Sequence, residues 1–513
     1  MRDSSLKPNE DEDKDGNLAM DKQVEMLHQD PMSPLYWFCE LSQIPRASYH
    51  EEKVAAWLMD FAKEKGFFAA TDKDRNVFIR MPATPGYEHV PPVLLQGHTD
   101  MVAEKNADCD HNFDTDPLDL YIEDGYLRAR GTTLGADDGI AVAVMLAVLN
   151  GAIEPHPAVE CLFTASEEVG LDGAKGFDTS LITAHRMINM DSTSLSEIIT
   201  GCCGGIRSDL TFRPEREDYP DSVPVRLFLS GLCGGHSGED INKGRRNANR
   251  VSGRMLATLL ETVPYRLISV RGGSKDNAIP RECEAVVAVK KKDLEAFTAC
   301  FERERDEIFR ILRGPDCSAK WECALLPGCS LKPMGQTWTR NLVFLLSTVQ
   351  NGVFSMDPDI PTLVGFSRNL GVIRTEGDTV DLVFSTRSAY DSQLAASTRQ
   401  LDQYAAVLGA TARHYAKYPG WVADPESAVR KLWSEAYSRV SGGSIEPLVI
   451  HAGLECGLLF EKRPDLDIIS VGPNLYDIHS PGEKMELRSV EVFWKTLKTV
   501  FRMICAQEGA SDA

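Results

Sequence analysis

The chain has 513 residues, of which 43% are hydrophobic and 26% are charged, and its formal net charge is -21. This length exceeds what one hydrophobic core usually supports, so we expect at least two folding units in a globular protein. The strong negative charge argues against binding to nucleic acid or anionic lipid, because both carry charges of the same sign. The longest apolar run, residues 140–149, is too short to cross a bilayer, so no membrane span is predicted.

Residues 1–31 are rich in acidic side chains and lack the apolar stretch of a signal peptide. We expect them to form a disordered acidic tail, whose purpose the sequence does not indicate. The thirteen cysteines include no C-x-x-C pair, and an odd, unpatterned set is typical of reduced thiols. A cytoplasmic location is therefore predicted.

The spacing of apolar residues predicts helices at 34–41 and 51–65, separated by a proline-broken loop at 44–50. Further along, we expect strands at 76–81, 92–96, 158–164, 186–191 and 466–473, a hairpin turning at 124–125, a helix that ends at 149, and a final helix at 489–504. Strands that alternate with helices indicate an α/β fold.

The middle of the chain differs from the two ends. Strand-like and helical runs alternate there, but they carry no comparable set of metal ligands. The expected strands are 225–229, 265–270, 285–289, 370–374 and 379–384, and the expected helices are 248–262, 293–312, 338–350 and 393–408. Since potential ligands occur on both sides of this region, we interpret residues 205–420 as an α+β domain inserted into a first domain formed by residues 32–204 and 421–513.

Potential metal ligands follow several predicted strands of the first domain. His98 and Asp100 come directly after the strand at 92–96, and alternation places them on one face. Two further strands end in the pair Glu167 and Glu168 and in Asp191. Ligands bind at the carboxyl ends of strands in open α/β sheets, so we expect these side chains to lie close together. Each alone has a structural alternative, such as a hydrogen-bonded His-x-Asp pair or a solvated acidic loop.

Two turns add further candidates. Asp137 lies in a glycine-framed turn just before a helix, where a single aspartate could simply cap the helix, and His479 lies in a loop after the last predicted strand. A set of His, Asp and Glu without cysteine suits Zn²⁺ or a similar divalent ion at an open, catalytic site. Two histidines and at least four carboxylates are too many for one tetrahedral ion, and they suit two ions that share a carboxylate with a water between them.

Several ordered motifs together resemble one known family. They are GHTDM (97–101), GTTLGADDG (131–139), the Glu167-Glu168 pair, Met190-Asp191, GGHSG (234–238), NAIPRE (277–282), HAGLECG (451–457) and IHSPGE (478–483). The chain is similar, from about residue 34 to 506, to the aminoacyl-histidine dipeptidases, also called peptidase D or cytosolic non-specific dipeptidases, of the co-catalytic zinc aminopeptidase and carboxypeptidase clan. This resemblance implies a zinc-peptidase catalytic domain with a central mixed sheet flanked by helices, interrupted by an inserted lid domain.

The resemblance also implies an activity, namely hydrolysis of Xaa-His and other dipeptides by a hydroxide that bridges two divalent ions, zinc or else cobalt or manganese. It implies that one ion is bound by His98 and Asp191, the other by Glu168 and His479, and both by Asp137. Asp100 would orient His98, as a carboxylate commonly does for a metal-bound histidine. Glu167 would be the general base. Many relatives have asparagine where this chain has Asp138, but the bridging position is kept.

Three residues of the inserted domain are implied to meet the substrate. His236 would stabilise the developing oxyanion, Arg387 would bind the free carboxylate, and Asn277 would line the pocket. Taken alone, each is more simply read as an ordinary loop residue or a surface ion pair. The HAGLECG motif resembles part of the pocket wall, and neither His451 nor Glu455 receives a role.

Other functions remain open at this point. A related metal amidase, such as a tripeptidase, a carboxypeptidase or an N-acyl amino acid deacylase, would need the same ligands, because pocket shape decides among them. A non-catalytic scaffold of the same fold is a further alternative, although metal binding alone would not require Glu167. The expected partner is a dipeptide, and family resemblance suggests a homodimer.

Overall fold

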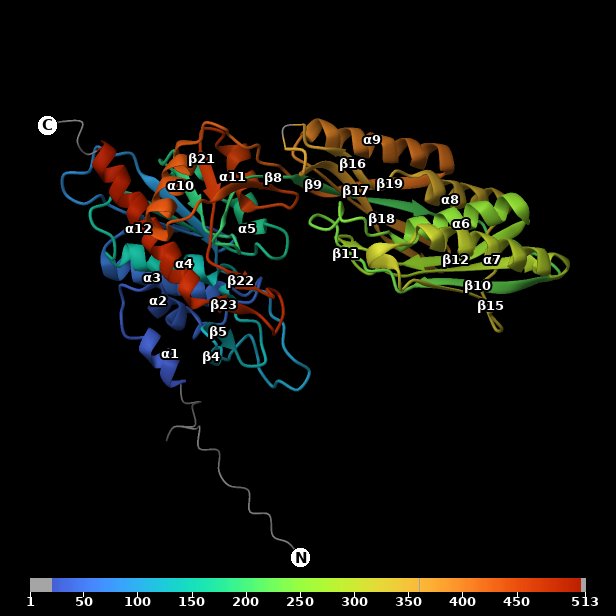
Figure 1. The fold of residues 1–513 in the computed structure, drawn as a ribbon, viewed down its shortest axis with the longest axis horizontal. Coiled ribbons are helices and arrows are strands. Elements are labelled where there is room, and N and C mark those ends of the chain that lie inside the picture. Colours follow the sequence, from blue (N-terminus) through green and yellow to red (C-terminus); the bar gives the residue numbers. More distant parts are fainter. Residues whose placement is uncertain (1–20, 359, 509–513) are drawn as a thin grey trace, which may run out of the picture. The chain divides into compact units, whose positions relative to one another are not determined.

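The computed structural model describes residues 21–358 and 360–508 and divides into two compact units (Figure 1). Unit 1 consists of the chain up to residue 201, residues 423–449 and the chain from residue 454 onward, and unit 2 consists of residues 202–422 and 450–453. We expected residues 450–453 in the second part of the first domain. They group instead with unit 2, where the Cys203 amide donates to the Ile450 carbonyl over 3.1 Å and His451 contacts Ser367.

Unit 1 is built on an eight-stranded mixed sheet. In spatial order its strands are β1 (Phe68–Thr71), β2 (Val77–Met81), β6 (Val159–Thr164), β3 (Val93–His98), β7 (Arg186–Asn189), β21 (Asp467–Ser470), β8 (Glu197–Cys202) and β20 (Glu446–Ile450). The four strands β6, β3, β7 and β21 are parallel, whereas β1, β2 and β8 pair in the antiparallel sense. The carboxyl ends of the four parallel strands therefore meet at one edge of the sheet.

Helices flank this sheet, as expected. They are α2 (Pro34–Leu41), α3 (Glu52–Lys65), α4 (Ala136–Leu149), α5 (Asp172–Gly176), α10 (Ala428–Ser441), α11 (Glu455–Lys462) and α12 (Leu487–Glu508). α4 packs on β3 and is buried nearly all round, because its sequence is almost wholly apolar. The amphipathic helices α3, α10 and α12 contribute one face each to the same core. No helix in residues 21–358 and 360–508 is both long and apolar enough to cross a membrane.

A small antiparallel sheet completes unit 1, in the order β22 (Leu475–Tyr476), β23 (Lys484–Glu486), β5 (Tyr126–Ala129) and β4 (Leu120–Glu123). The predicted hairpin at Asp124 and Gly125 joins β4 to β5. The tail prediction was too long: residues 1–20 lie outside the described residues, but Lys22–Leu27 forms helix α1. Its Val24 is fully buried in a cluster with Phe38, so this segment packs rather than remaining disordered.

Unit 2 is built on a nine-stranded antiparallel sheet. Its main path is β15 (Lys320–Leu325), β10 (Ser222–Ser230), β14 (Cys283–Lys290), β12 (Tyr265–Gly272), β17 (Val364–Glu376), β18 (Thr379–Ser388), β9 (Gly204–Phe212) and β19 (Ala410–Tyr418), with β16 (Gly352–Met356) paired to β17. Four helices share a core with this sheet (Figure 1): α6 (Ala248–Thr262), α7 (Leu294–Ile311), α8 (Gln336–Thr348) and α9 (Asp391–Leu408). A two-stranded sheet joins β11 (Gly235–His236) to β13 (Ala278–Ile279).

Candidate metal centre

Three neighbouring parallel strands, β6, β3 and β7, end together in unit 1. His98, the last residue of β3, pairs with Thr164, the last residue of β6, and Gln96 pairs with Asn189, the last residue of β7. All residues of β3 are buried, and a shift of the strand pairing by one residue would turn each side chain, including that of His98, to the opposite face of the sheet. The register thus brings to His98 the acidic residues that follow the strands, namely Glu167, Glu168 and Asp191.

Asp137 lies between two imidazole rings. Its Oδ1 is 3.2 Å from Nε2 of His98, and its Oδ2 is 3.2 Å from Nε2 of His479. Two groups of possible ligands share Asp137, one of His98, Asp137 and Asp191 and one of Asp137, Glu168 and His479. A third group consists of His98, Glu167 and Glu168, and within each group the donor atoms lie within 4.8 Å of one another. One carboxylate shared by two ligand groups is the arrangement that a pair of bridged cations needs.

The charges of the site fit a divalent cation. Burial is the largest cause that raises the pKa of Asp191 well above its usual range, and the charges of Asp137 and Asp138 raise it further. Hydrogen bonds with Asp137 and Glu168 raise the pKa of His479 to about 10. So many crowded carboxylates call for compensating positive charge, and a cation supplies it while keeping the carboxylates ionised and the imidazoles neutral.

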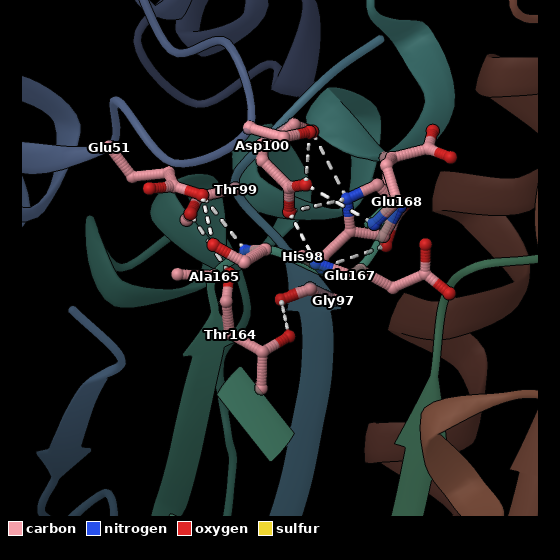
Figure 2. A network of polar contacts seen from close by, with 12 residues as sticks. Glu51, Gly97, His98, Thr99, Asp100, Thr164, Ala165, Glu167 and Glu168 are labelled. Carbon is pink, nitrogen blue, oxygen red and sulfur yellow. Dashed lines mark hydrogen bonds and ion pairs between the residues drawn. The ribbon is translucent and has the colours of Figure 1, made fainter. Parts of the chain in front are cut away.

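Asp100 lies behind His98 and holds two parts of the site at once. Nδ1 of His98 is 3.1 Å from the main-chain oxygen of Asp100 and 3.4 Å from its Oδ1, which keeps the Nδ1 proton in place and leaves Nε2 for a metal. The Asp100 carboxylate also accepts hydrogen bonds from the amides of Glu167, at 2.9 Å, and Glu168, at 3.2 Å (Figure 2). Burial would raise the pKa of Asp100, but the hydrogen bonds with His98 and its other neighbours lower it overall.

Gly97 lets the turn that carries Asp137 approach β3. A Cβ atom at residue 97 would lie 2.4 Å from the Cβ of Ala141 and 2.5 Å from Oδ2 of Asp138, which is closer than non-bonded atoms come. Because glycine leaves this space free, the start of α4 packs directly on the end of β3. Asp138 is buried there and accepts a hydrogen bond of 3.3 Å from the amide of His98.

No role was predicted for Glu483, although it is the last residue of the IHSPGE motif. Its carboxylate accepts hydrogen bonds from four successive amides where α4 begins, those of Leu134 (2.8 Å), Gly135 (3.0 Å), Ala136 (2.8 Å) and Asp137 (3.4 Å). A negative charge is favourable at these unpaired amides. Since Glu483 follows His479 by four residues, it joins the His479 loop to the Asp137 turn.

Arg46 is a second residue that the sequence analysis missed. It is buried, and its guanidinium donates to the carbonyls of Thr99, at 2.9 Å, and Gly135, at 2.6 Å. It therefore links the end of β3 to the turn before α4. A lone arginine in a proline-broken loop carried no signal of this role, because both partners are distant main-chain atoms.

The two residues of the HAGLECG motif without a role belong to different units. Glu455 is fully buried in unit 1, where its Oε2 accepts hydrogen bonds of 2.6 Å from both Gln96 and Thr164, and burial raises its pKa to about 7. His451 is buried in unit 2, with its Nε2 2.7 Å from Oγ of Ser367. Burial, followed by the charge of Arg387, lowers the pKa of His451 to about 3, so this imidazole is neutral.

The three predicted substrate-binding residues all lie in unit 2. His236 pairs with Ala278 in the sheet of β11 and β13, and the amide of Ser237 donates to the carbonyl of Asn277 over 2.7 Å. Arg387 on β18 is almost buried and donates to the hydroxyl of Tyr418 over 3.0 Å. Burial is the largest cause that lowers the pKa of His236, and the positive charge of Arg387 lowers it further. A neutral imidazole that can donate a hydrogen bond therefore lies in the field of a guanidinium.

Comparison with known proteins gives a consistent result. Residues 94–504 match the model of Peptidase family M20/M25/M40. The chain is 37% identical over 474 residues to a cytosol non-specific dipeptidase of Escherichia coli (strain K12), covering 92% of this chain and 97% of the relative. It superposes on the crystal structure of an aminoacylhistidine dipeptidase from Vibrio alginolyticus with a TM-score of 0.85 and 35% identity, covering 94% and 98% of the two chains. A Staphylococcus aureus tripeptidase shares the fold, with a TM-score of 0.53, 17% identity and coverage of 93% and 99%.

Proposed function

The chain belongs to Peptidase family M20/M25/M40, and from this we propose that it is a dipeptidase that uses two divalent ions, zinc in the first place, with cobalt or manganese as alternatives. The observation that carries the proposal is the position of Asp137, whose two carboxylate oxygens face His98 and His479 separately. Membership of the family makes the chain a metal-dependent peptide-bond hydrolase. The number of ions and the dipeptide substrate are what we propose.

The five ligand residues divide between the two ions as their distances suggest. His98 and Asp191 would hold one ion, Glu168 and His479 would hold the other, and Asp137 would bind both. When bound, such ions lower the pKa of a water molecule and polarise a carbonyl group. Asp100 would keep the His98 ring in the tautomer and orientation that the ion needs.

Glu167 is proposed as the general base. It lies beside His98 and Glu168, yet neither of the two ligand groups that share Asp137 includes it. Burial is the main cause that raises the pKa of Glu167 well above its usual range, and a base with a raised pKa accepts a proton more readily. Its carboxylate would take a proton from the attacking water and then deliver it to the leaving amine.

The residues of unit 2 are proposed to bind the substrate. His236 would donate a hydrogen bond to the oxyanion, a contribution typically worth a few kcal/mol per donor. Arg387 would bind the free carboxylate of the dipeptide with its planar guanidinium, and Asn277 would contact the peptide beside it. A fixed carboxylate anchor favours short peptides, because it sets the distance from the C-terminus to the bond that is cleaved.

Location and assembly are further expectations. A cytoplasmic location is supported by the unpatterned cysteines and by the E. coli relative, which is named a cytosol dipeptidase. We also propose a homodimer, and this proposal is based on the family resemblance alone.

The substrate class is tested with the wild type and the Arg387→Ala variant on four substrates: a dipeptide ending in histidine, its C-terminal amide, a tripeptide and an N-acyl amino acid. We expect the wild type to prefer the dipeptide. Arg387→Ala should lower kcat/KM for the dipeptide by roughly 10²-fold, because one partner of a charged pair is lost. For the amide, the loss should stay below about tenfold, because that substrate has no carboxylate for Arg387 to bind.

Arg374→Ala is the matched control, since Arg374 lies on the neighbouring strand β17 and its side chain is 56% exposed. Equal losses on the dipeptide and on its amide would exclude Arg387 as the carboxylate anchor. A preference for the tripeptide or the N-acyl amino acid would overturn the dipeptidase assignment. A chelator should abolish hydrolysis by the wild type, and added metal should restore it. If the wild type shows no such metal-dependent hydrolysis, the protein is a scaffold and not an enzyme.

A further inference from the structure

The turn that carries Glu167 and Glu168 is held on its other side by a carboxylate outside the metal centre. Glu51 comes directly before helix α3, and its side chain is completely buried. Its Oε1 accepts hydrogen bonds from the amide of Ser166, at 2.9 Å, and from the hydroxyl of Ser166, at 2.7 Å. In Figure 2, dashed lines link Asp100 to Glu167 and Glu168, and Glu51 lies apart from Asp100, at the left of the view.

Ser166 needs such support because of its backbone conformation. Its φ is +53°, in the left-handed region that residues with a side chain rarely adopt. The residue is almost buried and lies between the end of β6 and Glu167. If the backbone at Ser166 relaxed toward a negative φ, the Glu167 carboxylate would be displaced, since the two residues are adjacent.

Two further contacts hold the Glu51 side chain in place. Nε of Arg75 donates to its Oε2 over 2.9 Å, and the amide of Tyr49 donates to its Oε1, also over 2.9 Å. A buried carboxylate is costly unless it is paired and hydrogen-bonded, and these four hydrogen bonds meet that need. Glu51 is therefore a fixed hydrogen-bond acceptor for Ser166.

The short segment that contains Glu51 also supports Asp100. The hydroxyl of Ser48 donates to Oδ2 of Asp100 over 2.8 Å, and Asp100 in turn accepts from the amides of Glu167 and Glu168. Residues 48–51 thus reach three successive residues of the turn, Ser166 directly and the next two through Asp100. From the sequence, residues 48–50 were expected in a loop and Glu51 at the start of a helix, and no function was predicted for any of them.

We infer that Glu51 is a positioning residue for catalysis, which fixes the Ser166 turn and thereby the place of the Glu167 carboxylate. This inference rests on the proposed role of Glu167 as the base. Glu51 does not touch the substrate or the reacting atoms, and it acts only through Ser166. Glutamine at position 51 keeps the shape of the side chain but removes the charge. Its NH₂ group must also face donors, either Nε of Arg75 in place of Oε2 or the groups of Ser166 and Tyr49 in place of Oε1.

Two measurements on the full-length Glu51→Gln variant test the inference. In the metal-free protein, hydrogen exchange at the amide of Ser166 should become about tenfold faster or more, because its acceptor is weakened, and exchange at the amides of Glu167 and Glu168 should also become faster, because the turn that carries them is less firmly held. In the metal-loaded protein, kcat should fall by roughly 10- to 100-fold while KM stays within about threefold, as expected for a displaced catalytic group.

Glu52→Gln is the matched control. Glu52 is the next residue and pairs with the same arginine, at 3.0 Å from Nη1 of Arg75, but its side chain is 65% exposed. It should change neither measurement. Ser166→Ala is the second variant, which removes only the hydroxyl donor and should produce smaller changes in the same directions. It decides the question by the same two measurements if Glu51→Gln does not fold.

Unchanged exchange at residues 166–168 would overturn the inference, because Glu51 would not hold the turn. Faster exchange with kcat at the level of Glu52→Gln would also overturn it, because the turn would then not position the base. Failure of the proposed base is distinguishable from both results. It would appear as an active Glu167→Gln variant, whatever the exchange measurement on Glu51→Gln gives.

Discussion

Replacing Glu167 by glutamine should leave the bound metal in place and lower kcat by roughly 10²- to 10⁴-fold, the range typical for loss of a general base. Glutamine has nearly the shape of glutamate, but its amide cannot accept a proton from water at neutral pH. Glu167 forms a possible ligand group with His98 and Glu168 but belongs to neither group that shares Asp137. Because we assign it as the base and not as a ligand, the metal content should not change. Steady-state kinetics with saturating metal, together with elemental analysis of the dialysed protein, measures both quantities.

Glu168→Gln is the natural comparison, because the two glutamates are adjacent and both of their amides bind Asp100. Oε1 of Glu168 lies 2.9 Å from Nε2 of His479, so this variant should lose metal together with activity. A Glu167→Gln enzyme near the wild-type rate would remove Glu167 as the base. A Glu167→Gln enzyme without metal would make Glu167 a ligand instead.

Asp137→Asn should abolish tight binding of both ions. Each oxygen of Asp137 faces a different histidine, and asparagine replaces one oxygen by an NH₂ group and removes the negative charge. Metal ions contribute several kcal/mol to catalysis, so activity should fall by on the order of 10³-fold or more. Kinetics at increasing zinc concentration measures the loss and shows whether excess metal restores activity.

Asp138→Asn is the matched control for this variant. Asp138 is adjacent and buried, but it belongs to neither ligand group, and burial raises its pKa well above the usual range. An amide of the same shape keeps an oxygen that can accept the hydrogen bond from the His98 amide, so the replacement should be tolerated. If Asp138→Asn lost as much activity and metal as Asp137→Asn, any substitution in this turn would disturb the site. The result would then give no support to Asp137 as the residue that binds both ions.

Much of unit 1 was predictable because its elements follow local rules. Helix α2 begins and ends where the apolar spacing indicated, and the strands that end near the site are continuous buried runs. Helix α10 was missed although its signals are present. Ser427 caps its first turn, and Val429, Leu432 and Trp433 form an apolar stripe.

Some elements had no local signal. β19 contains no fully buried residue and includes Arg413 and Lys417, so its strand conformation depends on pairing with β9, about two hundred positions earlier in the chain. Strand propensity and the spacing of apolar residues do not predict such a strand, because its stability comes from the partner strand.

The residues that we propose as ligands could be identified from the sequence, whereas the residues that hold them in place could not. His98, Asp137, Glu168 and Asp191 follow strands or precede a helix, and these positions converge in any parallel sheet with this register. The supporting residues hold main-chain atoms from far away in the sequence, as Glu483 holds the turn before α4. A carboxylate that binds distant amides leaves no spacing pattern, so only the structure reveals its role.

The central claim is that side chains from separate strand ends and turns hold a pair of ions through Asp137. Calorimetric titration of the metal-free chain with zinc tests it most directly. The account predicts two equivalents of tightly bound zinc per chain in the wild type and loss of both in Asp137→Asn. One equivalent in the wild type, or two in Asp137→Asn with unchanged affinity, would contradict it.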